Sequence, residues 1–521
     1  MDTFDAIVVG SGPNGLVAAA ILGRAGWRVA VLERAPIAGG AVRSEELTRP
    51  GYVHDNYSAF YGILHGSPVF TELELDRRLE WRTFSIPVAA LTSPDEAGLI
   101  HAGTEATAAG LGADGDNWRE LRDWWSDTGR NLFDLLMGAL PPSPVSGLRL
   151  LRSAGLRGSL ASGRRLVEPM ESLARRTFST EPARLALACG VSHTDLAVDQ
   201  AGSVPLGLYL AMVAQEKNMP VPVGGARRLA EALQAAVTEA GGEIRTGCEV
   251  TRIVVERKRA VAVETTAGSV AARRAVLADV GPEQLLRRLV REDQLPSRYR
   301  DGLRAFRYGS GVFKVDLALD GPAPWNVDAL RECGVVHVTG DLDNMARSAF
   351  EVRRGWLPAR PLLIVGQQSV ADPSRAPSGG HTLWIEMHVP ARPRGDAAGR
   401  IAGREWSELK QPFFERVMSV LEEHAPGLGG KVAGSAALTP AELEAQNPNL
   451  VGGDLGSGST ALDQMAVFRP VPGWFRHATP IRGLYLCSAS THPGGGVHGR
   501  SGRACAHRVL ADARLRRLPA R

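Results

Sequence analysis

The chain has 521 residues, 44% of them apolar and 22% charged, and carries a formal net charge of +4. A chain of this length and composition can form two domains, each with its own hydrophobic core. Basic and acidic residues are interspersed, so the small positive excess does not predict a nucleic-acid-binding protein.

Cysteine usage and the chain start point to a cytoplasmic protein. The widely spaced cysteines form no C-x-x-C pair, which argues against a disulfide framework or a zinc site, and we expect no metal. No secretory signal is recognisable, and no segment reaches the roughly 18 to 20 consecutive apolar residues of a spanning helix. Contact with a membrane surface is left open. The cysteines are Cys189, Cys248, Cys333, Cys487 and Cys505.

The strongest local signal is a strand, a glycine turn and a helix near the N-terminus. The apolar run 6–9 predicts a strand buried on both faces of a parallel sheet. Gly10, Gly12 and Gly15 then form the pattern G-x-G-x-x-G. Such a turn brings backbone N–H groups and a helix N-terminus close to a diphosphate. The sequence therefore predicts a dinucleotide site here.

A second strand, at residues 28–32, ends in Glu33, where the pattern requires an acid for the ribose hydroxyls. The continuation RAPIAGGAVRS, residues 34–44, resembles the R-x(4)-G-G-x-x-[RS] segment of flavin-dependent desaturases and amine oxidases. The resemblance implies FAD as the cofactor. It places the double glycine Gly39–Gly40 close to FAD and the arginines near its phosphates.

Residues 45–80 are rich in aromatic, histidine and hydroxyl side chains. The motif SEE-x-x-x-PG-x-x-x-D, then a serine, then SP-x-x-x-EL-x-L, resembles bacterial phytoene-desaturase-related and carotenoid-isomerase-like FAD oxidoreductases. In that family the segment matching residues 55–58 passes close to the isoalloxazine ring and the substrate. The alternative interpretation is a polar loop between domains.

The middle of the chain predicts a substrate domain. Alternation at 309–320 places Lys314 and Asp316 on the face opposite Phe313 and Val315. With further predicted strands at 335–339, 362–368 and 382–390, this suggests a mixed sheet that walls a substrate cavity. We expect helices at 116–138, 168–181, 183–196, 206–215 and 405–424. The amphipathic segment 148–165 predicts a cap helix, or alternatively a lid or membrane-surface helix.

Two later segments resemble family elements that contact FAD. Residues 221–233 resemble P-x-GG-x-x-x-L-x-x-AL, in which a glycine turn opens a helix. The closing signature, GLYLC followed by ASTHPGGGV, spans 483–497 and predicts a helix that begins near Gly496 and points at the flavin. Ser488 stands where family members usually carry glycine, which puts the local turn geometry in question.

The predicted fold class is α/β. A discontinuous Rossmann-like FAD-binding domain with a central parallel sheet (1–85, 216–300 and 446–521) receives an inserted α+β substrate domain with a mixed sheet and a helical cap (86–215 and 301–445). The motifs and the resemblance together assign the FAD contacts to Gly10, Ser11, Gly12, Pro13, Asn14, Gly15, Glu33, Arg34, Gly39, Gly40, Ala41, Arg43, Val250, Asp279, Ser490, Thr491, Gly496 and Val497.

The resemblance implies an FAD-dependent dehydrogenase or desaturase for a largely apolar, polyene or natural-product-like substrate, with oxygen or a quinone as electron acceptor. Candidate proton acceptors are His54, Tyr57, Tyr61 and His492, and a reaction without a side-chain base is also considered. The alternatives are an amine oxidase, a flavin-dependent reductive cyclase or isomerase, and a non-catalytic flavin-binding protein. The oligomeric state is left open.

Overall fold

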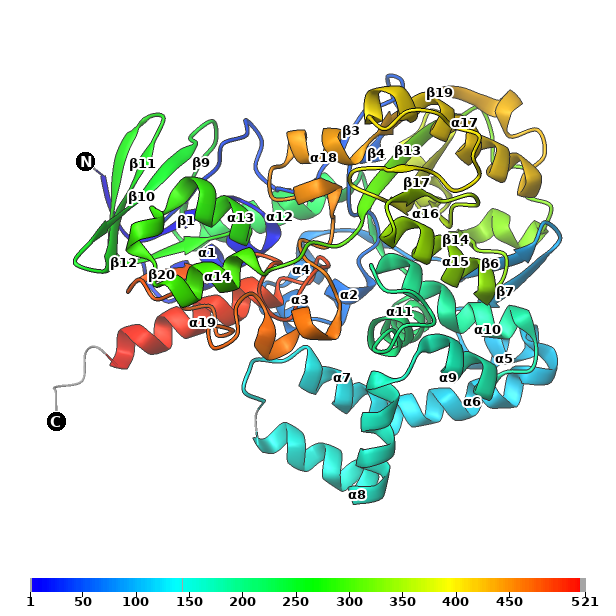
Figure 1. Cartoon of the computed structure of the whole chain (residues 1–521), viewed down its shortest axis with the longest axis horizontal. Coiled ribbons are helices and arrows are strands. Elements are labelled where there is room, and N and C mark those ends of the chain that lie inside the picture. The colour runs from blue at the N-terminus through cyan, green and yellow to red at the C-terminus, as the bar shows by residue number, and fades with distance from the viewer. Residues whose placement is uncertain (1, 143, 516–521) are drawn as a thin grey trace.

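The computed structural model describes residues 2–142 and 144–515. Within these residues two seven-stranded sheets lie at opposite sides of the molecule, and a layer of helices lies beneath the second sheet (Figure 1). This arrangement confirms the predicted α/β fold class. None of the described helices is long and apolar enough to cross a membrane.

The first sheet is the nucleotide-binding sheet expected from the glycine motif. Its parallel part has the order β9-β2-β1-β12-β20, and β10 and β11 extend it antiparallel from the first half of β12. The strands are β1 (Asp2–Val9), β2 (Val29–Leu32), β9 (Glu243–Arg245), β10 (Val250–Glu256), β11 (Arg259–Thr265), β12 (Gly268–Ala278) and β20 (Leu484–Leu486).

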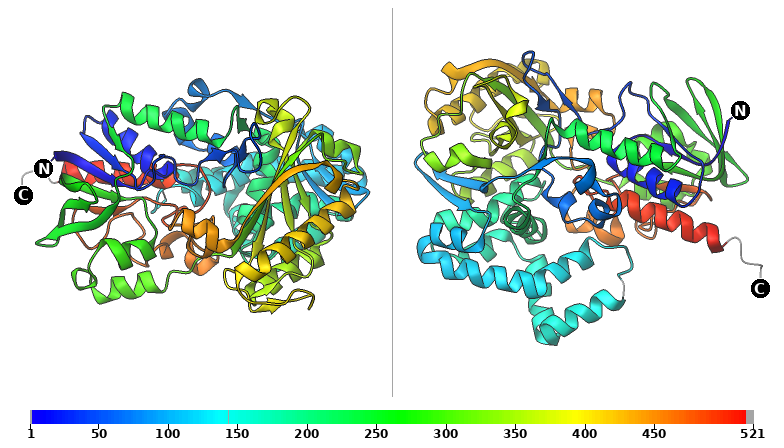
Figure 2. Two further views of the ribbon diagram at one scale, coloured as in Figure 1. Left: turned by 90° about the horizontal axis from the view of Figure 1, so that it is seen from above. Right: turned by 180° about the vertical axis from the view of Figure 1, so that it is seen from behind.

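Three helices cover one face of this sheet: α1 (Pro13–Arg24), α12 (Ala226–Glu239) and α19 (Arg500–Leu515). Seen from behind, they lie side by side across it (Figure 2). Their apolar side chains and those of β1 form one buried core, and a second core on the other face includes helix α14 (Ser297–Arg304). Burial on both faces explains why the second half of β1, residues 6–9, is continuously apolar.

The second sheet has the order β19-β13-β17-β16-β14-β6-β7, and only its β14–β6 pair is parallel. Helix α17 (Trp406–His424) packs on one face of this sheet. The strands are β6 (Ile86–Ser93), β7 (Glu96–Ile100), β13 (Gly311–Leu319), β14 (Cys333–Val338), β16 (Leu363–Gly366), β17 (His381–Val389) and β19 (Val432–Leu438).

The helical layer packs near the opposite face. The predicted helix 116–138 is divided into α6 (Gly115–Trp124), a π-helical turn (Trp125–Gly129) and α7 (Arg130–Leu136). The predicted helix 183–196 also differs, because α10 (Glu181–Ala188) gives way to a 3₁₀ turn at Cys189–His193. The other helices of this layer are α5 (Thr104–Gly110), α8 (Pro144–Val167), α9 (Met170–Thr177) and α11 (Val204–Lys217).

Helix α8 contains the predicted amphipathic segment 148–165. Gly155 interrupts it with φ 64° and ψ 179°, which are not helical angles. The side chains of residues 143–146, 149–151, 153, 154 and 156 lie outside the described part, as do residues 516–521 of the predicted last domain segment. The predicted domain boundaries themselves stay a prediction.

Candidate cofactor site

Glu33, at the end of β2, stabilises the glycine turn through hydrogen bonds. Its Oε2 accepts hydrogen bonds from the Ser11 backbone N–H (2.9 Å) and the Ser11 hydroxyl (2.7 Å). Its Oε1 accepts one from the Ala35 N–H at 2.8 Å, and its carbonyl accepts one from Cys248 N–H, close to Val250 at the start of β10. Glu33 therefore links the glycine turn to the segment that leads into β10.

A second glycine segment packs directly on the first. A Cβ atom at Gly40 would lie 2.8 Å from the Gly12 Cα, and Gly40 has a φ of +58° that favours glycine. At Gly39 a Cβ would lie 2.8 Å from the Ala230 side chain. Any side chain at Gly40 would fill this cradle, so a bulky substitution there should exclude a cofactor.

Two helix N-termini meet at the same place. Pro13 opens α1, where its missing N–H and fixed φ cost nothing. The Asn14 Oδ1 accepts a hydrogen bond from Gly502 N–H of α19 at 3.2 Å, and a Cβ at Gly502 would lie only 2.0 Å from the Asn14 carbonyl oxygen. The positive ends of both helices are thus directed at one region, as a diphosphate requires.

Unpaired polar atoms border the cradle. Arg43 Nε and Asn56 Oδ1 are buried and have no hydrogen-bond partner among the described residues, although both side chains also contact Glu45. Arg34 is exposed and donates to the Gln446 carbonyl oxygen at 3.4 Å. The glycine cradle, the paired helix N-termini and the unused Arg43 donor fit the diphosphate and ribityl part of FAD.

The helix of the closing segment begins later than predicted. Helix α19 begins at Arg500 and not near Gly496, because Gly494, Gly496 and Gly499 have positive φ angles that interrupt a helix. Gly496 and Val497 therefore lie in the preceding loop. Hydroxyl groups fix this loop: Ser490 Oγ donates to the Ser457 carbonyl, and Thr491 Oγ1 donates to the Ser488 carbonyl at 2.7 Å.

Ser488 does not disturb the turn. Its φ is not positive, so the position does not require glycine, and its hydroxyl donates to the Val280 carbonyl at 2.8 Å.

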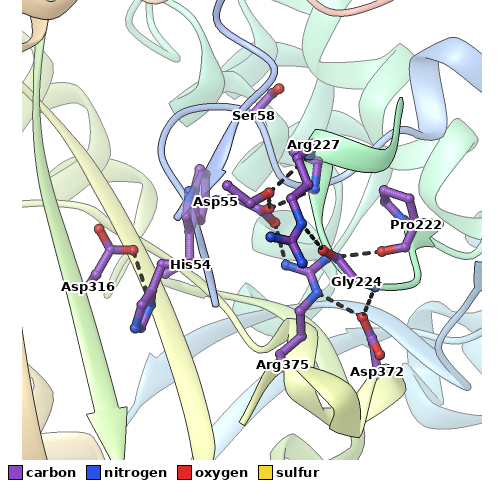
Figure 3. Close-up of polar contacts among 12 residues, drawn as sticks. His54, Asp55, Ser58, Pro222, Gly224, Arg227, Asp316, Asp372 and Arg375 are labelled. Atoms are coloured by element: carbon purple, nitrogen blue, oxygen red, sulfur yellow. Dashed lines mark hydrogen bonds and ion pairs between the residues drawn. The ribbon is translucent and has the colours of Figure 1, made fainter. Parts of the chain in front are cut away.

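A buried ion-pair network holds the loop 54–58 (Figure 3). Arg375 lies between Asp55 and Asp372, donating to them at 2.9 and 2.8 Å and to the Pro222 carbonyl at 3.2 Å. Asp55 also accepts from the Ser44 hydroxyl and from the N–H of Ala226, the first residue of α12. The network joins three distant chain segments, 44–55, 222–226 and 372–375. Sequence reasoning missed Arg375 and Asp372, because no local pattern marks them.

The four candidate proton acceptors are all buried. Burial raises the pKa of Tyr57 to about 12, and its hydroxyl donates to Gln446 Oε1 at 2.9 Å. Tyr61 is fully buried beside Ser58, and burial raises its pKa well above its usual range. Burial lowers the pKa of His54 to about 3 and that of His492 to about 4. His492 Nε2 is hydrogen-bonded to the Gly138 carbonyl at 2.7 Å.

The second sheet presents buried charges to the loop 54–58. Lys314 stands opposite Glu386, and Asp316 opposite Trp384, in the β13–β17 pairing. Lys314 donates to Asp316, and the Trp384 indole N–H donates to the Tyr57 carbonyl at 3.0 Å. The predicted polar face of β13 is therefore correct in its alternation, but both faces of the strand are buried.

The carboxyl groups of this face have raised pKa values. Burial raises the pKa of Asp316 to about 6 and that of Glu386 to about 8, although nearby Lys314 opposes both shifts. His54 Nδ1 lies 3.5 Å from Asp316 Oδ1, and neither atom has a hydrogen-bond partner. The Glu386 carboxyl group makes no hydrogen bond with any described residue, and its Oε1 is buried. Sequence reasoning did not single out Glu386.

A parallel sheet with a glycine turn, a ribose-side acid and two converging helix N-termini is the arrangement that binds a dinucleotide such as FAD. Comparison with known proteins agrees, since residues 14–383 match the family described as flavin containing amine oxidoreductase. The chain belongs to this family, and FAD is its cofactor.

Two relatives and one solved structure illustrate the similarity. The chain is 28% identical to "Pyridine nucleotide-disulfide oxidoreductase domain-containing protein 2" of Rattus norvegicus, covering 98% of this chain and 94% of the relative. It is 25% identical to "Phytoene desaturase (neurosporene-forming)" of Cereibacter sphaeroides, covering 96% and 93%. A redesigned putrescine oxidase superposes with a TM-score of 0.61 at 16% identity, covering 99% of both chains, and shows the shared fold.

Proposed function

We propose that this oxidoreductase dehydrogenates or desaturates a largely apolar substrate, of the polyene or natural-product type, and passes the electrons to oxygen or a quinone. The resemblance puts the flavin ring close to the loop 54–58, and we call this part the ring end of the site. The supporting observation is a group of half-buried apolar side chains near this end: Phe60, Ile63, Leu206 and Met219. A Cβ at Gly496 would lie 3.5 Å from Ile63 Cδ1, so Ile63 lies beside the closing loop. The relative named as a phytoene desaturase supports the same substrate class.

FAD, when bound, supplies the hydride acceptor, and the protein orients the substrate and excludes water. The edge contact between Phe60 and Trp384, with ring centroids 6.2 Å apart, and the Trp384 bond to Tyr57 fix the loop 54–60 on the second sheet. His54, Tyr57, Tyr61 and His492 stay the predicted proton acceptors. Of these, His54 has an unpartnered ring nitrogen that lies near a carboxylate.

Anaerobic mixing of the yellow holoprotein with defined reductants tests the substrate class. We expect a monoterpene or a C40 polyene hydrocarbon to bleach the flavin band, and primary amines and NADPH to leave it unchanged. Bleaching by amines alone would replace the proposal with amine oxidation. Bleaching by NADPH alone would replace it with the reductive cyclase or isomerase.

Amine oxidation is the second candidate, and Glu386 favours it. The Glu386 carboxyl group faces the loop 54–58 without a hydrogen-bond partner, and ionisation on binding a substrate ammonium group would give it one. If an amine bleaches the flavin, Glu386→Gln should weaken its binding, whereas Glu442→Gln, in a half-buried pair with Lys410, should not.

We further propose a cytoplasmic protein with peripheral membrane contact through α8. Leu148, Leu160 and Val167 of this helix are 47%, 68% and 52% exposed. Sedimentation with zwitterionic lipid vesicles should be reduced when Leu160 is replaced by Glu. Equal sedimentation of wild type and variant would contradict this contact.

A further inference from the structure

Asp279, the residue after β12, has its carboxyl group inside the glycine turn. A Cβ at Gly12 would lie 2.5 Å from Asp279 Oδ2, and one at Gly15 would lie 2.8 Å from the same atom. A Cβ at Gly10 would lie 3.1 Å from the Asp279 carbonyl oxygen. Each glycine of the motif therefore provides space for Asp279 as well as for a cofactor.

The carboxyl group caps helix α1 from outside the helix. The N-cap residue Gly12 has no side chain, and the first turn contains no acidic residue. Asp279 Oδ2 accepts a hydrogen bond from the Gly15 N–H at 3.0 Å, which is the bond that an N-cap side chain usually accepts. A carboxylate at this helix end is favourable as long as no other anion is present.

FAD brings a second anion to the same helix end. The diphosphate and an ionised Asp279 would repel each other across a buried, poorly screened space. No described basic side chain pairs with Asp279. The titratable groups that face it are Glu33 from the end of β2 and Cys487 from the end of β20, and neither supplies a positive charge.

We propose that Asp279 couples FAD retention to pH: the neutral carboxylic acid accommodates the diphosphate, and the carboxylate weakens its binding. Burial, with a contribution from Glu33, raises the pKa of Asp279 to about 7, so the change falls near neutral pH. The inference depends on FAD as cofactor and not on the proposed substrate.

The Kd for FAD, measured by ultrafiltration of holoprotein between pH 6 and 8.5, tests this coupling. We expect the wild-type Kd to rise above pH 7 by up to about tenfold per pH unit, the limit for one linked proton. Asp279→Asn keeps an acceptor for Gly15 N–H without the charge. It should give a Kd that is independent of pH and lower than wild type at pH 8.

Asp114 provides the matched control, because its carboxylate also caps a helix from a distant part of the chain. It accepts the N–H groups of Ser179 and Thr180, both at 2.8 Å, at the start of α10, and hydrogen bonds lower its pKa to about 2. Asp114→Asn should leave the pH dependence of FAD binding unchanged. An Asp279→Asn variant with the wild-type pH slope, or with weaker FAD binding at every pH, would overturn the proposal.

A measurement on the wild type alone tests the proposal even if the variant does not fold. At pH 8 in weak buffer with an indicator dye, displacement of FAD should release close to one proton per site. Release of FAD without a change in bound protons would also overturn the proposal.

Discussion

The two ends of the site bury carboxylates by different means. At the nucleotide end, Glu33 and Asp279 are held chiefly by backbone N–H groups of Ser11, Ala35 and Gly15. At the ring end, Asp55 and Asp316 pair with the buried cations Arg375 and Lys314. The nucleotide end depends on backbone geometry, whereas the ring end depends on charges from distant segments.

The two ends of the site should therefore be sensitive to different kinds of substitution. Backbone donors are kept in every substitution except one to proline, so the nucleotide end fails chiefly when a side chain enters the space that glycine leaves. A buried ion pair fails when one partner is lost, because the other charge remains without compensation.

Arg375→Met should have the largest effect. It leaves Asp55 and Asp372 without their buried cation, and the expected loss is about 3–5 kcal/mol in the free energy of unfolding. Urea unfolding measures it. Arg331→Ala, which breaks an exposed pair with Asp328, is the control and should cost less than about 0.5 kcal/mol. Equal losses in the two variants would show that the ring-end network does not hold the fold.

Gly40→Val should strip the cofactor without unfolding the protein. The new side chain would collide with the Gly12 backbone at a positive φ, so we expect at least about a 100-fold weaker Kd for FAD, or roughly 2.7 kcal/mol. The ratio of flavin to protein absorbance measures the effect. Gly430→Val, where no atom lies within 4 Å of the added Cβ, is the control. Normal flavin content in Gly40→Val would contradict the assigned cradle.

Glu386→Gln should change how stability depends on pH. Because the folded-state pKa of Glu386 is raised to about 8 from its ordinary 4.5, wild-type stability is lost as pH rises from about 5 through 8. The free energy of unfolding of the variant should therefore increase relative to that of the wild type by up to about 1.4 kcal/mol per pH unit in this window. Thermal unfolding at pH 5.5 and 7.5 measures the gain. A constant difference between the two proteins would show that Glu386 ionises normally.

Tyr57→Phe should have the smallest effect. It removes one hydrogen bond to Gln446, which is worth about 0.5–1.5 kcal/mol. Since the Tyr57 hydroxyl stays protonated at neutral pH, the FAD content should not change. Loss of flavin from the variant would contradict this expectation and would indicate that Tyr57 contacts the cofactor.

Much of the first sheet was predictable because its signals are local. The apolar run of β1, the glycines of the turn and the acid at Glu33 fall within one βαβ unit, and their roles follow from backbone geometry. The start of α19 was predicted about one turn too early, because the positive φ angles of Gly496 and Gly499 are not evident from glycine spacing alone.

By itself, the sequence determined the cofactor class, the α/β fold and the periodicity of strands such as β13. Only the tertiary structure decided that both faces of β13 are buried, that Arg375 pairs with Asp55, and that Asp279 enters the glycine turn. The physical reason is the sequence separation between the residues that interact. Strand and turn signals depend on neighbours within a few residues, whereas Asp279 and Gly15 meet across 264 residues, and only the folded sheet brings their atoms together.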